Sequence, residues 1–125
     1  MYFIYKNEEN MKILLFCIIT TFVWLLYVPT SQSANLAENI CGYIAVDDKG
    51  RLRKLLKSNR LKLRKVFQDT SCNNDNLLIF AARQNANEVG QLLIKKLPKK
   101  VVANDLENLA TLSPELTAFA KARIN

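Results

Sequence analysis

Apolar residues recur at spacings of three and four from residue 35 to the end of the chain, a pattern typical of amphipathic helices. In the first range, Leu36, Ile40 and Ile44 fall on one face. The pattern predicts helices over Asn35–Val46, Lys49–Lys57, Leu77–Gln84, Glu88–Leu97, Asp105–Leu112 and a last one that opens at Ser113. The sequence therefore predicts an all-α fold.

Short polar residues mark where several of these helices begin. Either Asp47 or Asp48 can cap the second helix, and Asn87 can cap the fourth. Ser113 precedes Pro114, as expected of an N-cap followed by the first helical residue. We expect these neighbouring residues to set the helix boundaries.

The segment from Lys49 to Phe67 permits more than one interpretation. As one continuous helix it would place its leucines on one face and its charges on the other, which is typical of a helix lying on a membrane surface. Ser58 and Asn59 instead indicate a helix end, and the alternation of Leu61–Arg64 then suits an extended arm. A third interpretation has the leucines facing the domain core and the charges in solvent.

The helices also repeat in sequence. A shift of 37 residues matches Tyr43 with Phe80, Ala45 with Ala82, Leu52 with Val89, Leu55 with Leu92 and Leu56 with Leu93. A shift of 39 residues matches Leu77–Ala81 with Leu116–Ala120. Periods of this size are typical of stacked helix-turn-helix units that bury their apolar faces only against each other.

One stretch of this repeat resembles a known module. Asn76–Leu93, with the sequence NLLIFAARQNANEVGQLL, is similar to the two-helix part of an ankyrin repeat. No Gly-x-Thr-Pro-Leu-His run precedes it, and the period is longer than the family's value of about 33 residues. The resemblance implies a small stack of ankyrin-like units, and a generic small helical bundle is the alternative.

A continuous apolar run precedes the helical region. Ile13–Val28 follows Lys12, and the small residues Ser31 and Ser33 suit an export signal that is cleaved before Ala34. An uncleaved anchor is the alternative, because the run is close to the lower limit of about 17 residues for a membrane span. We predict three parts: an over-called extension over residues 1–10, a signal peptide over 11–33 and a small helical domain over 34–125. The predicted location is the periplasm or the exterior.

Two cysteines, Cys41 and Cys72, follow the predicted signal. An even cysteine count in an exported domain predicts a disulfide, and two buried free thiols are the alternative. The pair does not have the C-x-x-C spacing of redox sites. Two thiolates without histidine would also leave a tetrahedral zinc site half empty. We therefore expect neither a metal nor a cofactor.

The cysteine pattern carries a second resemblance. An early cysteine in a helix, then Cys72-Asn73, Leu77 and Phe80-Ala81, resembles a family of short exported bacterial proteins of uncharacterised function. The resemblance implies export and a cysteine pair. It implies no chemistry, because the family has no assigned activity.

The strongest charge feature is a basic stretch between positions 49 and 65. Its nine basic residues, with no acidic residue among them, are Lys49, Arg51, Arg53, Lys54, Lys57, Arg60, Lys62, Arg64 and Lys65. Such a field attracts phosphate or carboxylate groups. Because export argues against nucleic acid, we expect these residues to bind an acidic protein or an anionic envelope component.

Catalytic chemistry finds little support in the composition. The chain has no histidine, which excludes Ser-His-Asp and Cys-His arrangements, and its three glycines form no phosphate-binding loop. We therefore predict a small exported interaction module with a basic face and no enzymatic activity. The alternative is a protein that binds the envelope or an anionic membrane surface through residues 49–67.

Overall fold

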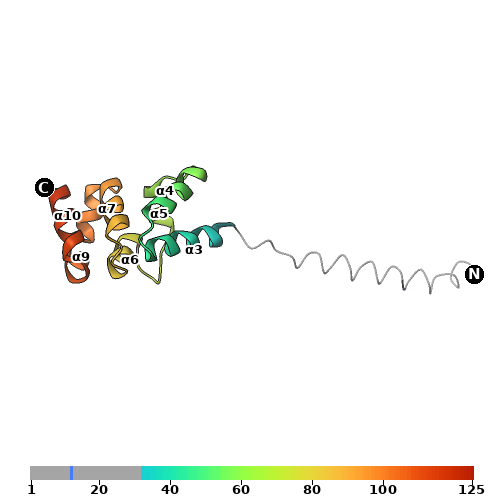
Figure 1. Ribbon diagram of the computed structural model, residues 1–125, viewed down its shortest axis with the longest axis horizontal. Coiled ribbons are helices and arrows are strands. Elements are labelled where there is room, and N and C mark those ends of the chain that lie inside the picture. The colour runs from blue at the N-terminus through green and yellow to red at the C-terminus, as the bar shows by residue number, and fades with distance from the viewer. Residues whose placement is uncertain (1–11, 13–31) are drawn as a thin grey trace, which may run out of the picture. The chain divides into compact units, whose positions relative to one another are not determined.

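The computed structural model describes Lys12 and residues 32–125. The predicted extension over residues 1–10 and the predicted signal up to Ser31 lie outside the described residues, apart from Lys12. Within residues 32–125 the chain forms eight helices and no strand: α3 (Gln32–Ala45), α4 (Lys49–Ser58), α5 (Leu63–Asp69), α6 (Leu77–Arg83), α7 (Asn87–Lys96), α8 (Lys99–Asn104), α9 (Leu106–Leu112) and α10 (Pro114–Ile124). The predicted all-α fold is confirmed (Figure 1).

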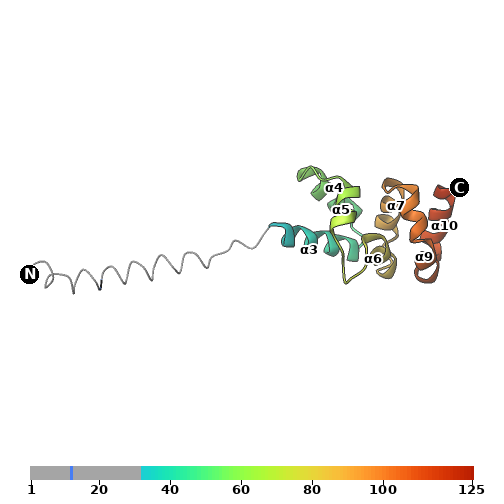
Figure 2. The ribbon, with the colours of Figure 1, turned by 180° about the vertical axis from the view of Figure 1, so that it is seen from behind.

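The helices form two rows. α3, α6 and α9 contact one another in succession in one row, and α4, α7 and α10 do so in the other. The consecutive pairs α3–α4, α6–α7 and α9–α10 are also in contact. Figures 1 and 2 show the two rows from opposite sides. The domain is therefore a stack of three helix pairs. The short helix α5 packs against α7, and α8 packs against α9 and α10.

Three helices end in the same Schellman motif. A residue with positive φ follows α3, α4 and α6, namely Asp47, Arg60 and Asn85, with φ of 55°, 54° and 55°. The next N–H in each case donates to the carbonyl oxygen five residues earlier. Aspartate and asparagine tolerate this conformation better than most residues other than glycine. The turns after α3 and α6 lead from one row to the other, and the turn after α4 leads into α5.

Local side chains cap three of the helices. Asp48 accepts a hydrogen bond from the Arg51 N–H, and Asn76 accepts one from the Ile79 N–H, each at 2.9 Å. The prediction of Ser113 as the cap of α10 is confirmed, with Pro114 as the first helical residue.

The prediction that Asn87 caps α7 is wrong. Ala86 occupies the N-cap position and has no side-chain acceptor, so Asn87 is already inside the helix. The Asn87 amide instead donates to Glu115 at 2.7 Å, which links α7 to α10. The main chain of α7 therefore requires a cap from elsewhere.

The predicted register of the repeat is off by one residue. α3 and α6 end 38 residues apart, and α4 and α7 correspond along their whole length at that same shift. α6 is buried over six successive residues, so matching apolar identities could not distinguish a shift of 37 from one of 38. The echo at 39 compared unlike positions, because residues 116–120 lie in α10, whereas α9 is the helix that contacts α6.

The interpretation of Lys49–Phe67 as one continuous helix is wrong, and the helix end indicated by Ser58 and Asn59 is correct. α4 ends at Ser58, with Asn59 as its C-cap, and the chain turns before α5 begins at Leu63. Leu52, Leu56 and Val66 are buried, which agrees with the interpretation that the apolar side of this segment faces the core. Among the described helices, none has both the length and the apolar character needed to cross a bilayer.

A disulfide joins the first helix pair to the second. Cys41 on α3 is bonded to Cys72, which lies in the turn before α6, 31 residues further along the chain. Cys72 is buried, and its N–H and carbonyl both pair with Asp75 across the turn. The predicted cysteine pairing is confirmed.

A close approach between α7 and α10 holds the third pair on the second. A Cβ atom added at Gly90 would lie 2.5 Å from Cδ1 and 2.7 Å from Cδ2 of Leu116. Leu116 is fully buried, so its side chain would have to shift within a close-packed core to admit that atom. The close approach of the two helices therefore favours glycine at position 90.

Removing the disulfide should weaken folding. We expect the double variant Cys41→Ser and Cys72→Ser to lose about 2–5 kcal/mol of unfolding free energy, because the bond restricts a 31-residue loop in the unfolded chain. Urea unfolding of oxidised protein, reduced protein and the double variant measures the loss. Intact mass should show the oxidised protein about 2 Da below the reduced one. Equal unfolding midpoints for oxidised and reduced protein would contradict the prediction.

Alanine at position 90 should destabilise the domain by overpacking. We expect Gly90→Ala to cost about 1–3 kcal/mol, although alanine has the better helix propensity. Leu116→Ala removes the clashing atoms, so Gly90→Ala should cost less in that background than in the wild type. Thermal unfolding of the wild type, the two single variants and the double variant completes this double-mutant cycle. Strictly additive costs would argue against the clash.

Candidate functional site

A groove about 490 Å³ in volume lies between α4, α5 and α7. Its lining residues, here named the basic groove, are Arg53, Lys54, Leu56, Lys57, Leu61, Leu63, Leu92 and Lys96. Four of them are leucines and the other four are cations. The groove therefore combines an apolar floor with positive charge.

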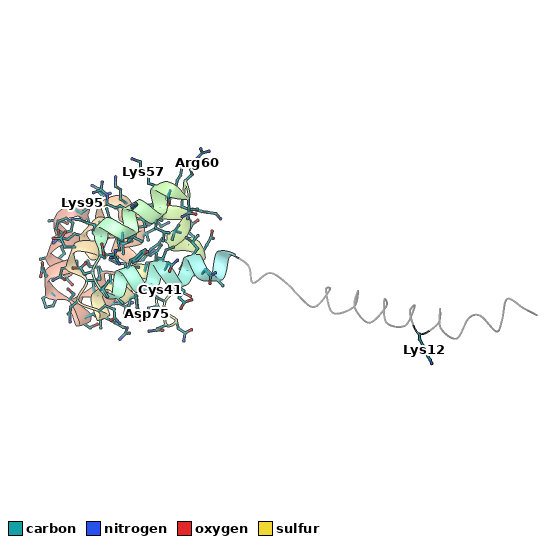
Figure 3. The ribbon with its side chains drawn as sticks, turned by 45° about the vertical axis from the view of Figure 1, so that its right-hand side comes forward. Lys12, Cys41, Lys57, Arg60, Asp75 and Lys95 are labelled. Atoms are coloured by element: carbon teal, nitrogen blue, oxygen red, sulfur yellow. A yellow bond between two sulfur atoms is a disulfide. The ribbon has the colours of Figure 1, made fainter. Side chains whose placement is uncertain are left out.

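Helical spacing places these side chains. On α4, Arg53, Leu56 and Lys57 are separated by three and four residues, and on α7 Leu92 and Lys96 are separated by four. Cations thus stand on both the α4 wall and the α7 wall. Figure 3 shows Lys57 and Lys95 on the same side of the domain, with Asp75 on the opposite side.

The structure divides the nine predicted binding residues into two groups. Lys49 pairs with Glu88, Arg51 with Asp48 at 3.3 Å, and Lys65 with Asp69 at 3.0 Å. The other six have no carboxylate partner within the described part of the chain: Arg53, Lys54, Lys57, Arg60, Lys62 and Arg64. Their charges are available to a ligand.

Only part of the predicted set lines the groove. Arg53, Lys54 and Lys57 do so. Arg60 and Lys62 lie in the turn after α4 and are exposed, as is Arg64 on α5. Arg51 instead lines a smaller hollow of about 330 Å³ between α3 and α4. The alternation of Leu61–Arg64 suggested an extended arm, but Leu63 and Arg64 lie in α5, and only Leu61 and Lys62 precede that helix.

Sequence reasoning missed the α7 wall of the groove. Lys96 was not among the predicted residues, although Lys95, Lys96, Lys99 and Lys100 form a second basic run at the end of α7 and the start of α8. This run was the available signal. Which of its members meets the first basic stretch depends on how α7 packs beside α4.

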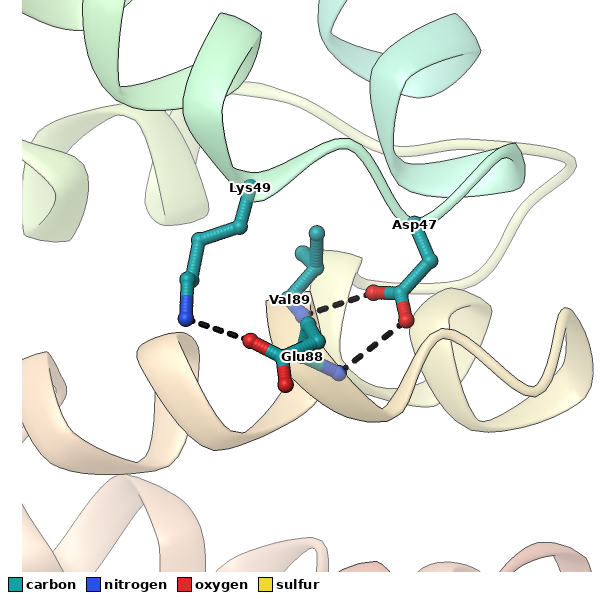
Figure 4. Close-up of polar contacts among 4 residues, drawn as sticks. All are labelled: Asp47, Lys49, Glu88 and Val89. Carbon is teal, nitrogen blue, oxygen red and sulfur yellow. Dashed lines mark hydrogen bonds and ion pairs between the residues drawn. The ribbon is translucent and has the colours of Figure 1, made fainter.

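An aspartate from the first helix pair caps α7. Asp47, in the turn between α3 and α4, accepts hydrogen bonds from the Val89 N–H at 2.8 Å and the Glu88 N–H at 3.2 Å (Figure 4). These N–H groups belong to the first turn of α7, which has no acceptor of its own. Negative charge is also favourable at a helix N-terminus. Asp47 therefore connects the α3–α4 turn to α7 and helps to set the geometry of the groove.

Lys49 adds an ion pair to the same junction. Its ammonium donates to Glu88 on α7, and Figure 4 shows Lys49 and Asp47 reaching the first turn of α7 from different sides. The hydrogen bond and the charge of Lys49 lower the pKa of the Glu88 carboxyl below its usual 4.5. Both groups are exposed, so this pair orients the junction more than it stabilises it.

A second cavity of about 450 Å³, next to the turn before α6 and beside α9, is polar. Its charged groups already have partners within the described residues. Asp75 accepts from Arg83 at 2.7 Å, and Asp105 accepts from the Asn76 amide at 2.9 Å. Burial raises the pKa of Asp105 above its usual 3.8. The cavity offers less unpaired charge than the basic groove, which is therefore the stronger candidate.

The cap from Asp47 can be tested by hydrogen exchange. We expect Asp47→Ala to cost about 1–2 kcal/mol and to speed exchange at the amides of Glu88 and Val89, because both lose their acceptor. Asp48→Ala should have a similar cost but should leave these two amides protected, because Asp48 caps only α4. Unchanged protection of Val89 in Asp47→Ala would contradict the assignment.

Comparison with known proteins places this chain in a family. Residues 40–107 match the family model DUF3718, described as a protein of unknown function. Neither the curated proteins nor the solved structures provide a match. The expectation of an uncharacterised family is thus confirmed, whereas the likeness to ankyrin repeats and the exported nature of the family stay predictions. Because the match covers more than half of the chain, the protein belongs to the DUF3718 family.

Proposed function

We propose that the protein is a non-catalytic binding module that uses its basic groove and the surrounding cations to bind an acidic protein partner. The observation that carries the proposal is the group of cations without carboxylate partners on both walls of one groove. The absence of histidine from the sequence favours binding over acid–base catalysis.

The chemistry of the groove favours an acidic protein over nucleic acid. Proteins that bind single-stranded nucleic acid usually stack bases on aromatic side chains, and the apolar residues that line this groove are all leucines. Leucine side chains instead suit the aliphatic residues of a protein partner. Carboxylates on that partner would complete the charge pairs.

Binding to an anionic membrane surface is the alternative from the sequence. That alternative relied on leucines available for insertion into lipid. Leu52 and Leu56 are buried in the domain, and among the described residues Val46 is the large apolar residue that is highly exposed, at 70%. The charges remain, and Leu61 and Leu63 stay partly exposed, but these two leucines line a groove instead of standing on an open helix face. The acidic protein partner is therefore the better supported proposal.

We further propose that the protein acts in an oxidising compartment, as a periplasmic or secreted protein. The Cys41–Cys72 bond supports this location, because such bonds persist where thiols are not kept reduced. The apolar run Ile13–Val28 supports it independently, as an export signal.

Charge reversal on one wall of the groove tests the proposed function. Labelled polyglutamate serves as the probe, with binding followed by fluorescence anisotropy. We expect Arg53→Glu with Lys57→Glu to weaken binding by at least about tenfold, and we expect added salt to weaken binding to the wild type.

Lys99→Glu with Lys100→Glu is the matched control, because it changes net charge equally at residues that do not line the groove. Equal losses in both variants would show that only net charge matters and would contradict the proposal. If the wild type sediments with anionic vesicles at physiological salt but does not bind polyglutamate, the result would favour the membrane alternative instead.

A further inference from the structure

The basic groove has an arrangement that a purely electrostatic surface does not need. Its floor contains Leu61, Leu63 and Leu92, which are all half-buried although they contact the core. Their remaining exposed area converges on one hollow. Exposed apolar area gathered in one place is typical of a site that binds another apolar surface.

The distribution of charge around this floor restricts the occupant. Arg53 and Lys57 lie on the α4 wall, and Lys96 lies on the α7 wall, so cations flank the leucines on two sides. An amphiphile with a single anionic head carries its charge at one end of its chain. The groove instead suits a ligand whose apolar stripe has negative charge along both edges.

An amphipathic helix has this distribution. Apolar residues spaced at i, i+3, i+4 and i+7 form one stripe, and the adjoining positions on both edges are free to carry carboxylates. Such helices bind in apolar grooves between helices of their partners. The groove is open to solvent and is formed by neighbouring helices, so a helical segment can reach its floor.

We infer that the basic groove binds a short acidic amphipathic helix of a partner protein. Aliphatic side chains of that helix contact Leu61, Leu63 and Leu92, and its carboxylates pair with Arg53 and Lys57 on one side and with Lys96 on the other. This inference rests on the proposed function and adds the form of the acidic partner.

Three synthetic peptides of equal length test the inference. The first carries leucines at i, i+3, i+4 and i+7, with glutamates along both edges of the stripe. The second has the same composition, with the leucines distributed around the helix. The third replaces every glutamate with glutamine. We expect the first peptide to bind at least about tenfold more tightly than either of the others.

Protein variants locate the binding. Lys96→Glu and Leu92→Gln should each weaken binding of the first peptide, and Lys100→Glu should not, because Lys100 does not line the groove. Thermal unfolding shows whether Leu92→Gln remains folded. If it does not, amide chemical shifts of the wild type titrated with the first peptide give the answer, and changes should cluster at residues 53–63 and 92–96.

The outcomes separate this inference from the proposed function. Equal binding of the first and second peptides, with the third unbound, would overturn the amphipathic helix and leave the acidic partner standing. Absence of binding by all three peptides and by polyglutamate would overturn both. Shift changes confined to residues outside the groove would overturn the inference even if the first peptide binds.

Discussion

The capping of α7 by Asp47 is the interaction on which much of the described domain depends. α7 lies at the centre of the stack and contacts α4, α5, α6 and α10. Its first N–H groups have no acceptor in their own turn, because Ala86 occupies the N-cap position. The carboxylate of Asp47 supplies that acceptor from the preceding helix pair. Separating α4 from α7 would leave helix N–H groups without this partner.

Two further constraints complete the stack. The Cys41–Cys72 bond joins the first and second pairs on the side of α3 and α6, while Asp47 joins them on the side of α4 and α7. Between the second and third pairs, Gly90 allows Leu116 to fill the space against α7. A small domain buries a modest fraction of its surface, so specific links between neighbouring units matter for its stability. The link from Asp47 also holds the start of α4 beside α7, and these two helices form the walls of the basic groove.

The candidate site was predictable from the sequence only in part. The cations of α4 were evident as an uninterrupted basic stretch, and three of them line the groove. Which of these cations have carboxylate partners was not evident, because one such partner, Glu88, lies 39 residues from Lys49 in the sequence. Lys96 and Leu92 were missed for the same reason, since they reach the site through the packing of α7 beside α4. α5 and α8 are short and lack side-chain caps, so tertiary packing rather than local signals defines them.

The sequence by itself determined the all-α class, the cysteine pair, several helix ends and the position of the basic stretch. These features depend on local periodicity, on capping residues such as Asp48 and Ser113, and on composition. Only the tertiary structure decided the register of the repeat, the cap of α7 and the existence of the groove. Each of these depends on contacts between residues that are distant in the chain, and the side chain of Asp47 shows why. From sequence alone it could cap the adjacent α4 equally well, and only the approach of α7 provides the N–H groups that it accepts.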